Sequence, residues 1–394
     1  MNAFFASVEQ LDYPELQGRP IGVTNGMTGT CVITSSYEAR KYGIKTGMRV
    51  KEAKKLCPHF VQRPARPERY SEISTRIMAA LQAITPTIEV FSVDEAFLDL
   101  TDCQYAFGSP VGMARRAKEV VFKASGLLCS VGVSGDKTTA KYAAKLQKPN
   151  GFTVIEPWTA RERLRDVPMT DLCGIKKGIG GFLAARGIYK CGDMQRLPIS
   201  VLAQRFGNPG RRIWYMAQGE DPEPVKTTVS PPKSIGHSKI MPPGTTDKTV
   251  IQTYLLHMSQ KVGTRLRKHN LEAQNFSIGM LSDHGYLVLK YKTVKPTDDG
   301  REIYALCMEF LTKYRTEWGA HQVQVTALDP KQANTQQDFF IQPDKQADRR
   351  NRAMDAINEK YGEFALAPAL LLKRSDMPNV ISPAWKPFGH RQTI

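Results

Sequence analysis

The chain lacks the residue patterns that mark zinc-binding, secreted and membrane-spanning proteins. Its seven cysteines are isolated, with no Cys-x-x-Cys pair and no cysteine–histidine cluster, so we expect no zinc site and a reducing cytoplasm. No apolar run reaches the roughly 18 residues of a membrane span, and we expect no membrane association. The first five residues contain no basic segment, so we expect no signal peptide and a cytoplasmic location.

Acidic residues are too few to balance the basic ones. The 394 residues include 55 Lys and Arg against 38 Asp and Glu, which gives a formal net charge of +17. The excess is spread along the whole chain and is not confined to one end. This predicts a polyanionic partner, most often nucleic acid, although a merely soluble basic protein would share the same composition. The length predicts two to four domains.

Hydrophobic periodicity predicts a mixed helix and strand layer in the first half of the chain. The expected elements are a helix at 68–84, strands at 88–92 and 96–100, a helix at 110–124, a strand at 129–134, a helix at 137–146 and a strand at 152–155. With one more strand before Phe5, this order resembles a β-α-β-β-α-β layer.

A second domain of about 100 residues is expected after a proline-containing linker at 227–233. Its predicted elements are a strand at 234–241, a helix at 250–266, a hairpin around 283–285, a helix at 303–314 and a strand at 323–328. Short glycine-rich helices are expected at 157–222. Past residue 330 the chain is polar, with one helical patch at 353–361.

Two adjacent carboxylates, Asp94 and Glu95, interrupt a strongly apolar segment. Such a pair is unfavourable beside apolar neighbours unless cations neutralise it. Mg²⁺ ions that handle phosphates are the simplest cations, because Mg²⁺ binds carboxylate oxygens and keeps positions open for a substrate. A solvent-facing hairpin turn is the alternative.

Four sequence blocks occur in an order that points to one family. They are NAFFASVE at 2–9, TSSYEARKYG at 34–43, SVDEAFLD at 92–99, and a block at 145–151 that ends in KPNG. Together they resemble the motifs of Y-family, lesion-bypass DNA polymerases, and the resemblance extends over roughly residues 1–330. Any one block alone would be a weak indication.

The resemblance implies an α+β fold shaped as a right hand, with a ferredoxin-like palm, small fingers, a helical helix-hairpin-helix thumb and a β-α-β-β-α-β little finger. The expected limits are palm 1–9 and 66–156 with a truncated first strand, fingers 10–65, thumb 157–226, linker 227–233, little finger 234–330 and a tail 331–394.

The activity implied is low-fidelity, template-directed DNA synthesis for translesion synthesis, without proofreading. A primer 3′-hydroxyl would attack the α-phosphate of a deoxynucleotide and release pyrophosphate, assisted by two Mg²⁺ ions. The resemblance implies Asp94 and Glu95 as catalytic metal ligands and the Met1 carbonyl as a backbone ligand. Primer–template DNA and dNTP would be the partners of a monomeric enzyme.

The resemblance also implies a set of nucleotide-binding residues. Arg40 can fork onto phosphate oxygens, and Lys148 supplies a flexible point charge. Phe5 matches the ring that excludes a 2′-hydroxyl, although core packing on a first strand would equally explain this residue. The full set is Phe4, Phe5, Thr34, Tyr37, Arg40 and Lys148.

Two groups of residues are expected to contact DNA. Lysines at four-residue spacing form one basic stripe on a helix, which could also be an ordinary solvated face. A glycine-rich hairpin at 173–183 would let backbone N–H groups approach a phosphate, but a lysine stands where the family usually has glycine. The residues are Lys137, Lys141, Lys145, Gly174, Lys176 and Gly178.

A short segment past the little finger resembles the bacterial peptide that binds a sliding clamp. It contains Gln336, Asp338, Phe339 and Phe340. Two aromatic residues on a polar tail suit a pocket on a partner, and tethering raises the local concentration of an enzyme with few DNA contacts. Packing of both rings on the little finger is the alternative.

One position departs from the family pattern. The family has an aspartate, its third metal ligand, immediately before the residue that Met1 matches, and this chain begins at Met1. An amino group there would be largely cationic and would repel Mg²⁺. Either the start is assigned at an internal methionine, which we favour, or the chain is truncated. Truncation would favour a second hypothesis, a non-catalytic adaptor that binds DNA and clamp.

Overall fold

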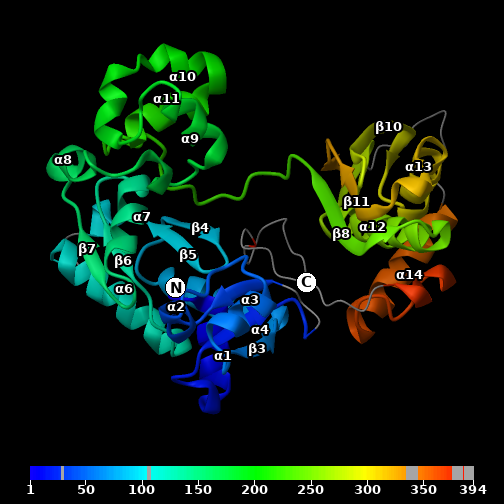
Figure 1. Cartoon of the computed structure of the whole chain (residues 1–394), viewed down its shortest axis with the longest axis horizontal. Coiled ribbons are helices and arrows are strands. Elements are labelled where there is room, and N and C mark those ends of the chain that lie inside the picture. Colours follow the sequence, from blue (N-terminus) through cyan, green and yellow to red (C-terminus); the bar gives the residue numbers. More distant parts are fainter. Residues whose placement is uncertain (28–30, 104–107, 334–344, 375–384, 386–394) are drawn as a thin grey trace. The chain divides into compact units, whose positions relative to one another are not determined.

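A computed structural model describes residues 1–27, 31–103, 108–333, 345–374 and 385. The chain divides into two compact units, of which the first combines Met1–Val229 with Met377–Ile394 and the second spans Ser230–Asp376 (Figure 1). The boundary between Val229 and Ser230 falls inside the linker expected at 227–233. Helix and strand are both abundant, as an α+β fold requires.

The residues expected to form the palm contain the predicted elements in the predicted order. They are α4 (Pro67–Leu81), β4 (Ile88–Ser92), β5 (Glu95–Leu98), α6 (Pro110–Ser125), β6 (Val131–Val133), α7 (Lys137–Leu146) and β7 (Phe152–Val154). In the described residues the strands form two ribbons, because β4 pairs with β5 and β6 pairs with β7. Helix α4 presents Tyr70, Ile73 and Ile77 to the core at helical spacing, and all three are fully buried.

The first residues lie between these two ribbons. The Met1 amino group donates a hydrogen bond to the Asp94 carbonyl at 2.5 Å, beside β4 and β5. The Asn2 amide N–H donates to the Leu128 carbonyl at 3.1 Å, just before β6. Helix α1 (Phe4–Asp12) then begins, so Phe5 lies in a helix. The alternative that placed Phe5 on a strand was therefore wrong about the element, although the ring is buried.

The fingers are built on a three-stranded sheet of order β2-β1-β3. Its strands are β1 (Ile21–Thr24), β2 (Val32–Ser35) and β3 (Val61–Pro64), and the helices are α2 (Tyr37–Lys41) and α3 (Val50–Leu56). Ser36 caps α2, because its hydroxyl accepts a hydrogen bond from the Ala39 N–H. This cap fixes the start of the helix that carries Tyr37 and Arg40.

The thumb is a small helical bundle with its own core. Its helices are α8 (Ala160–Leu164), α9 (Lys177–Ala184), α10 (Ile199–Phe206) and α11 (Asn208–Met216), packed around buried residues such as Leu172, Leu183 and Leu202. In the expected helix-hairpin-helix, the first helix is only a 3₁₀ turn, Met169–Asp171, and α9 is the second helix. The hairpin bends at Gly174, whose φ of 83° favours glycine.

A network of buried charges joins the palm to the thumb. Asp221 is fully buried at its side chain, pairs with both nitrogens of the Arg212 fork at 2.8 Å, and accepts from the Thr138 hydroxyl at 2.6 Å. Lys137 on α7 pairs with Glu89 on β4 at 2.8 Å and lies 3.8 Å from Glu223, which follows the last thumb helix. Because each buried charge has an opposite charge beside it, the network stabilises one arrangement of palm and thumb.

The second unit is a sheet covered by helices on one face. The order β10-β9-β11-β8 is formed by β8 (Ile235–Thr245), β9 (Leu271–Ser282), β10 (Gly285–Thr297) and β11 (Ala320–Ala327). Helices α12 (Lys248–Lys268) and α13 (Gly300–Lys313) pack against the sheet and against each other (Figure 1). The hairpin expected around 283–285 is confirmed, since Gly285 pairs with Ser282.

The chain past residue 330 continues this unit, whereas we expected a polar tail there. Strand β12 (Lys331–Gln332) pairs with β9, and α14 (Lys345–Tyr361) follows. Ion pairs hold α14 in place, because Arg267 forks onto Asp355 at 2.6 and 2.8 Å and Arg350 contacts Asp299 at 2.8 Å. Leu371, in the 3₁₀ turn Ala369–Lys373, is fully buried.

We predict that Asp221→Asn destabilises the first unit by roughly 2–4 kcal/mol, because Arg212 would lose a buried partner. Thermal unfolding followed by calorimetry measures this. Asp166→Asn is the matched control, since Asp166 forms an exposed ion pair with Lys190 and its loss should leave the melting temperature nearly unchanged.

The stability that Asp221 contributes should also depend on pH. Burial works against ionisation of Asp221, but hydrogen bonds from Arg212 and Thr138 outweigh it and hold the pKa below the ordinary value of 3.8. A lowered pKa stabilises the fold above that ordinary value, and the contribution disappears as pH falls through the folded value. The difference in the free energy of unfolding between the unaltered chain and Asp221→Asn should therefore be constant at about pH 5–8 and shrink below about pH 4. A difference that grows in acid would contradict the lowered pKa of Asp221.

Candidate active site

The two adjacent carboxylates lie at the tight turn between β4 and β5. Ser74 on α4 fixes this turn, because its hydroxyl donates to the Val93 carbonyl at 2.5 Å and both residues are buried. The Ser92 hydroxyl lies 3.2 Å from Asp94 Oδ1 and 3.2 Å from Glu95 Oε2. One hydroxyl therefore contacts both carboxylates, which places their oxygens close together on one side of the turn.

Positive charges offset this pair of carboxylates. Lys141 on α7 contacts Glu95 at 2.5 Å, and the Met1 amino group lies 3.7 Å from Asp94 Oδ2. Burial would raise the pKa of Glu95, but the Lys141 ammonium, together with smaller contributions from the chain terminus and Ser92, lowers it below the usual range. Glu95 is thus favoured in its ionised form, as a cation ligand requires.

The donor set suits a hard divalent cation. Asp94 and Glu95 are 30% and 41% exposed at their side chains, so their oxygens can be reached from solvent. The described residues contain no group of three or more His, Cys, Asp or Glu side chains placed to hold a metal. Mg²⁺ is commonly held by one or two carboxylates together with substrate phosphates, so two carboxylates fit an ion that arrives with a nucleotide.

The predicted phosphate-binding residues of the fingers lie on β2 and α2. Arg40 is exposed, donates from Nε to the Ser35 carbonyl at 3.1 Å, and holds its guanidinium 4.8 Å from the Tyr37 ring centroid. These contacts leave the terminal nitrogens of Arg40 available for phosphate oxygens. Thr34 is half-buried on β2, and Lys148 is exposed in the loop after α7.

Asn2 links these segments, and sequence reasoning gave it no role of its own. Its side-chain amide donates to the Ser130 hydroxyl at 3.0 Å and to the Tyr37 hydroxyl at 3.4 Å. Its amide oxygen accepts from the Asn150 N–H at 3.0 Å. The fingers helix, the palm strand β6 and the KPNG loop therefore meet at one buried residue.

Phe5 packs into the core of the palm. Its ring stacks on Tyr70 at a centroid distance of 4.5 Å, and only 5% of the residue is exposed. The Tyr70 hydroxyl in turn donates to the buried Glu9 carboxylate at 2.8 Å, and Arg66 contacts Glu9 at 2.9 Å. Phe4 is buried beside the same rings. The position of the Phe5 ring is thus determined by a charged, fully packed set of neighbours.

The lysine stripe on α7 has three different environments. Lys137 is 7% exposed and paired with Glu89, and Lys141 is paired with Glu95. Lys145 is exposed and donates to the Asp171 carbonyl at 3.0 Å. Lys145 is therefore the member of the stripe with the most solvent-accessible charge. The hairpin residues Gly174, Lys176 and Gly178 are all exposed on the thumb.

Comparison with known proteins gives the family. Residues 1–145 match the impB/mucB/samB family, and residues 232–339 match the impB/mucB/samB family C-terminal domain. A DNA polymerase IV of Moorella thermoacetica is 36% identical over 380 residues, covering 94% of each chain. The chain belongs to the Y-family DNA polymerases.

Other similar proteins agree with this assignment. A DNA polymerase IV of Pelotomaculum thermopropionicum is 32% identical over 379 residues, covering 94% of each chain. Among solved structures, the Y-family DNA polymerase chimera Dbh-Dpo4(243-245)-Dbh matches with a TM-score of 0.71 and 29% identity, covering 83% of this chain and 96% of that one. The right-hand architecture expected from the motifs is therefore confirmed.

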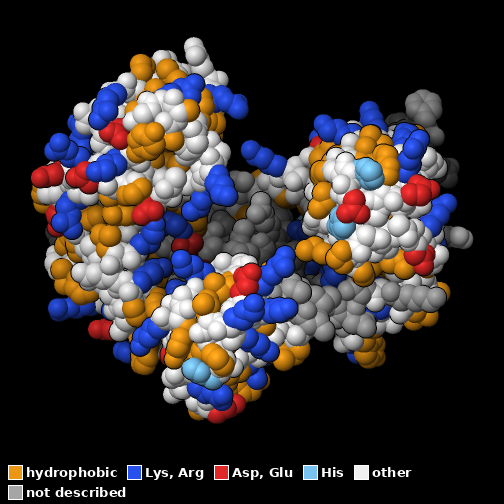
Figure 2. Space-filling model, viewed as in Figure 1, with side chains coloured by type: hydrophobic (Ala, Val, Ile, Leu, Met, Phe, Trp, Pro, Cys, Tyr) orange, Lys and Arg blue, Asp and Glu red, His pale blue; other side chains and the backbone are white. Residues whose placement is uncertain are grey.

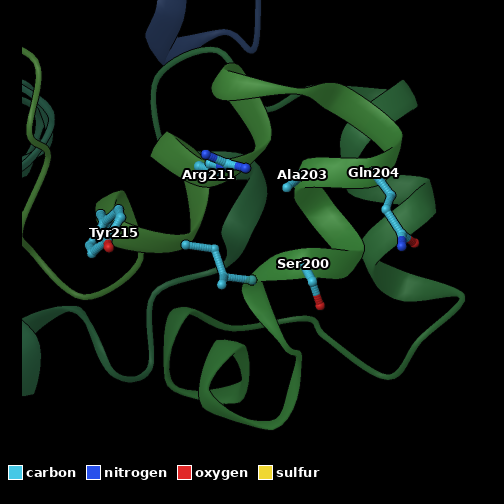
Figure 3. A pocket seen from close by; sticks show the side chains of 6 residues that line it. Ser200, Ala203, Gln204, Arg211 and Tyr215 are labelled. Atoms are coloured by element: carbon cyan, nitrogen blue, oxygen red, sulfur yellow. The ribbon is translucent and has the colours of Figure 1, made fainter.

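Two surface cavities lie in the catalytic unit of this Y-family chain. The larger, about 550 Å³, is a thumb groove between α10 and α11, lined by Ser200, Ala203, Gln204, Arg211 and Tyr215 together with Ile199 (Figure 3). None of these residues is among the predicted site residues. The smaller, about 380 Å³, lies between palm and thumb and is lined partly by Phe91 and Phe97 of the carboxylate hairpin.

Lys and Arg side chains are scattered over the visible face of both units, among hydrophobic and uncharged groups (Figure 2). Lys137 is one of the buried exceptions. No helix in the part of the chain that the structure describes is long and apolar enough to cross a bilayer. The predicted clamp-binding residues Gln336, Asp338, Phe339 and Phe340 lie outside the described residues.

Proposed function

We propose that this chain is a template-directed DNA polymerase that performs low-fidelity translesion synthesis without proofreading, and that Mg²⁺ serves its nucleotidyl transfer. The supporting observation is the meeting of three segments at Met1 and Asn2. Met1 contacts the carboxylate turn at Asp94, and Asn2 contacts the fingers at Tyr37 and the KPNG loop at Asn150. Acidic groups and triphosphate-binding groups thus surround one short peptide.

The residues around this peptide would contact different parts of the nucleotide. Arg40 and Lys148 place positive charge against the triphosphate, and Tyr37 and Thr34 offer hydroxyl donors. The Phe5 ring limits the space beside the sugar, because Tyr70 prevents it from moving away. Together these side chains hold the α-phosphate in line with the primer end, which favours one direction of attack.

The reaction joins the primer O3′ to the α-phosphorus and breaks the bond from that phosphorus to the β-phosphate oxygen. Pyrophosphate leaves, and the hydroxyl proton passes to solvent. Asp94, Glu95 and the Met1 carbonyl would hold the divalent cations, which when bound lower the pKa of the attacking hydroxyl and neutralise the leaving pyrophosphate. The Ser92 hydroxyl keeps the two carboxylates together for that task.

The open face of the little-finger sheet is suited to a DNA backbone. Lys290 and Lys292 are exposed on β10 and alternate with buried Tyr291. Because strand residues alternate between faces, both lysines lie opposite the helix-covered face. Such contacts neutralise phosphates without reading sequence, as a general polymerase requires.

Primer extension by the chain expressed from Met1, and separately with the genomic residues that precede it, tests the activity. Asp94→Asn and Glu95→Gln should each slow extension by at least about 100-fold, because each removes a cation ligand. Asp99→Asn, a carboxylate near the same hairpin that hydrogen-bonds Thr101, is the control and should keep most activity. Normal extension by both site variants would exclude two-metal use.

The adaptor hypothesis has a distinct outcome in the same assay. It predicts that every form of the chain retards primer–template DNA on a native gel while adding no nucleotide with Mg²⁺. Binding without extension, in both the Met1 form and the longer form, would replace the polymerase proposal.

Phe5→Ala tests sugar selection. The smaller side chain should admit ribonucleotides and lower the dNTP:rNTP preference by at least about tenfold, measured as the ratio of kcat/KM values. Phe60→Ala is the matched control, because it also removes a buried ring of the same unit and should lower stability with less effect on sugar preference. An unchanged ratio for Phe5→Ala would leave Phe5 a core residue only.

Changing Phe339 and Phe340 to Ala tests clamp binding. We expect stimulation by a bacterial sliding clamp to disappear, because the two rings would supply most of the apolar contact. Synthesis without clamp should be unchanged. A loss of clamp-free synthesis, or a lower melting temperature of the little-finger unit, would favour packing of the rings within the chain.

A further inference from the structure

We propose that the Asn2 side chain is a positioning residue for the incoming nucleotide, which it affects through its neighbours. The inference rests on the proposed function and adds a residue to it. Only 4% of Asn2 is exposed, so its amide group must find partners inside the protein. It finds them on three segments that are otherwise distant in the chain.

Both the nitrogen and the oxygen of the Asn2 side-chain amide form hydrogen bonds. Nδ2 donates to Ser130 Oγ at 3.0 Å and to Tyr37 Oη at 3.4 Å, and Oδ1 accepts from the Asn150 N–H at 3.0 Å. An amide is the neutral side chain that can donate twice and accept at the same time. Removing it would leave the Asn150 N–H and the Ser130 hydroxyl without this partner.

Two of these partners lie beside a group that would contact the triphosphate. Tyr37 carries the Arg40 guanidinium over its ring at 4.8 Å. Asn150 lies two residues after Lys148, and its φ of 56° places it in the left-handed region. A hydrogen bond to its N–H stabilises that uncommon backbone conformation. Asn2 therefore fixes the spacing between the two phosphate-binding cations.

The main chain of Asn2 is held separately from its side chain. The Asn2 N–H donates to the Leu128 carbonyl at 3.1 Å, and the Ser7 hydroxyl donates to the Asn2 carbonyl at 2.7 Å. Removing the side-chain amide should therefore leave residues 1–7 in place while uncoupling the fingers from the KPNG loop. This separation predicts a defect in nucleotide binding that exceeds any defect in folding.

The test is equilibrium binding of dATP to the full chain on a dideoxy-terminated primer–template with Mg²⁺, so that no incorporation is needed. Asn2→Ala should raise the Kd for dATP by about fivefold or more, as expected for lost hydrogen bonds. The Kd for primer–template should stay within about twofold, because Asn2 lies among nucleotide-binding groups.

Ser130→Ala provides a second variant that keeps Asn2. Ser130 is assigned no contact with nucleotide, so its effect must pass through the Asn2 amide. Ser130→Ala alone should raise the Kd for dATP by about two- to fivefold. Added to Asn2→Ala, it should raise the Kd no further. This non-additivity is the readout that a purely structural role would not produce.

Asn275→Ala is the control for loss of a structural amide. Asn275 Nδ2 donates to Asp329 at 2.7 Å in the other unit, so the variant should lower the melting temperature and leave the Kd for dATP unchanged. An unchanged Kd in both Asn2→Ala and Ser130→Ala, with only lower melting temperatures, would overturn the inference. Failure of the unaltered chain to bind dATP would instead overturn the proposed function, and this inference with it.

Discussion

The candidate active site depends on hydrogen bonds made by two consecutive residues, Met1 and Asn2. They contact the carboxylate turn, the end of a second ribbon, the fingers helix and the KPNG loop. These segments lie between 35 and 148 residues away along the chain. Because buried polar groups need partners, each of these contacts restricts how the segments around Met1 and Asn2 can be arranged.

Pairing of buried charges is the second constraint on the catalytic unit. Glu9 is buried against Arg66 and Tyr70, and Lys137 is buried against Glu89. Neither charge could stay in the interior alone, since desolvation would be too unfavourable. The network between palm and thumb obeys the same rule. A chain with a large net positive charge thus uses some cations to hold its own parts and displays the remainder to solvent.

Periodicity predicted most of the elements, and its failures have physical reasons. Helix α7 was predicted at its observed limits, and its buried Thr139 and Ala143 lie four residues apart, as one face of a helix requires. Strands β1 and β3 were missed, since four residues each are too few for a period to show. The extent of α14 was underestimated, because ion pairs such as Arg267–Asp355 hold that polar helix and no apolar stripe marks it.

The sequence by itself determined the family and the α+β order, and it predicted the chemistry of the site, because motifs and periodicity are local properties of the chain. Only the tertiary structure decided what individual residues do. Lys137 looked like a member of a DNA-facing stripe until Glu89 was found beside it, and only the fold brings the Asn2 side chain within hydrogen-bonding distance of Tyr37 and Asn150. Contacts between distant segments follow from chain topology, and no local pattern records them.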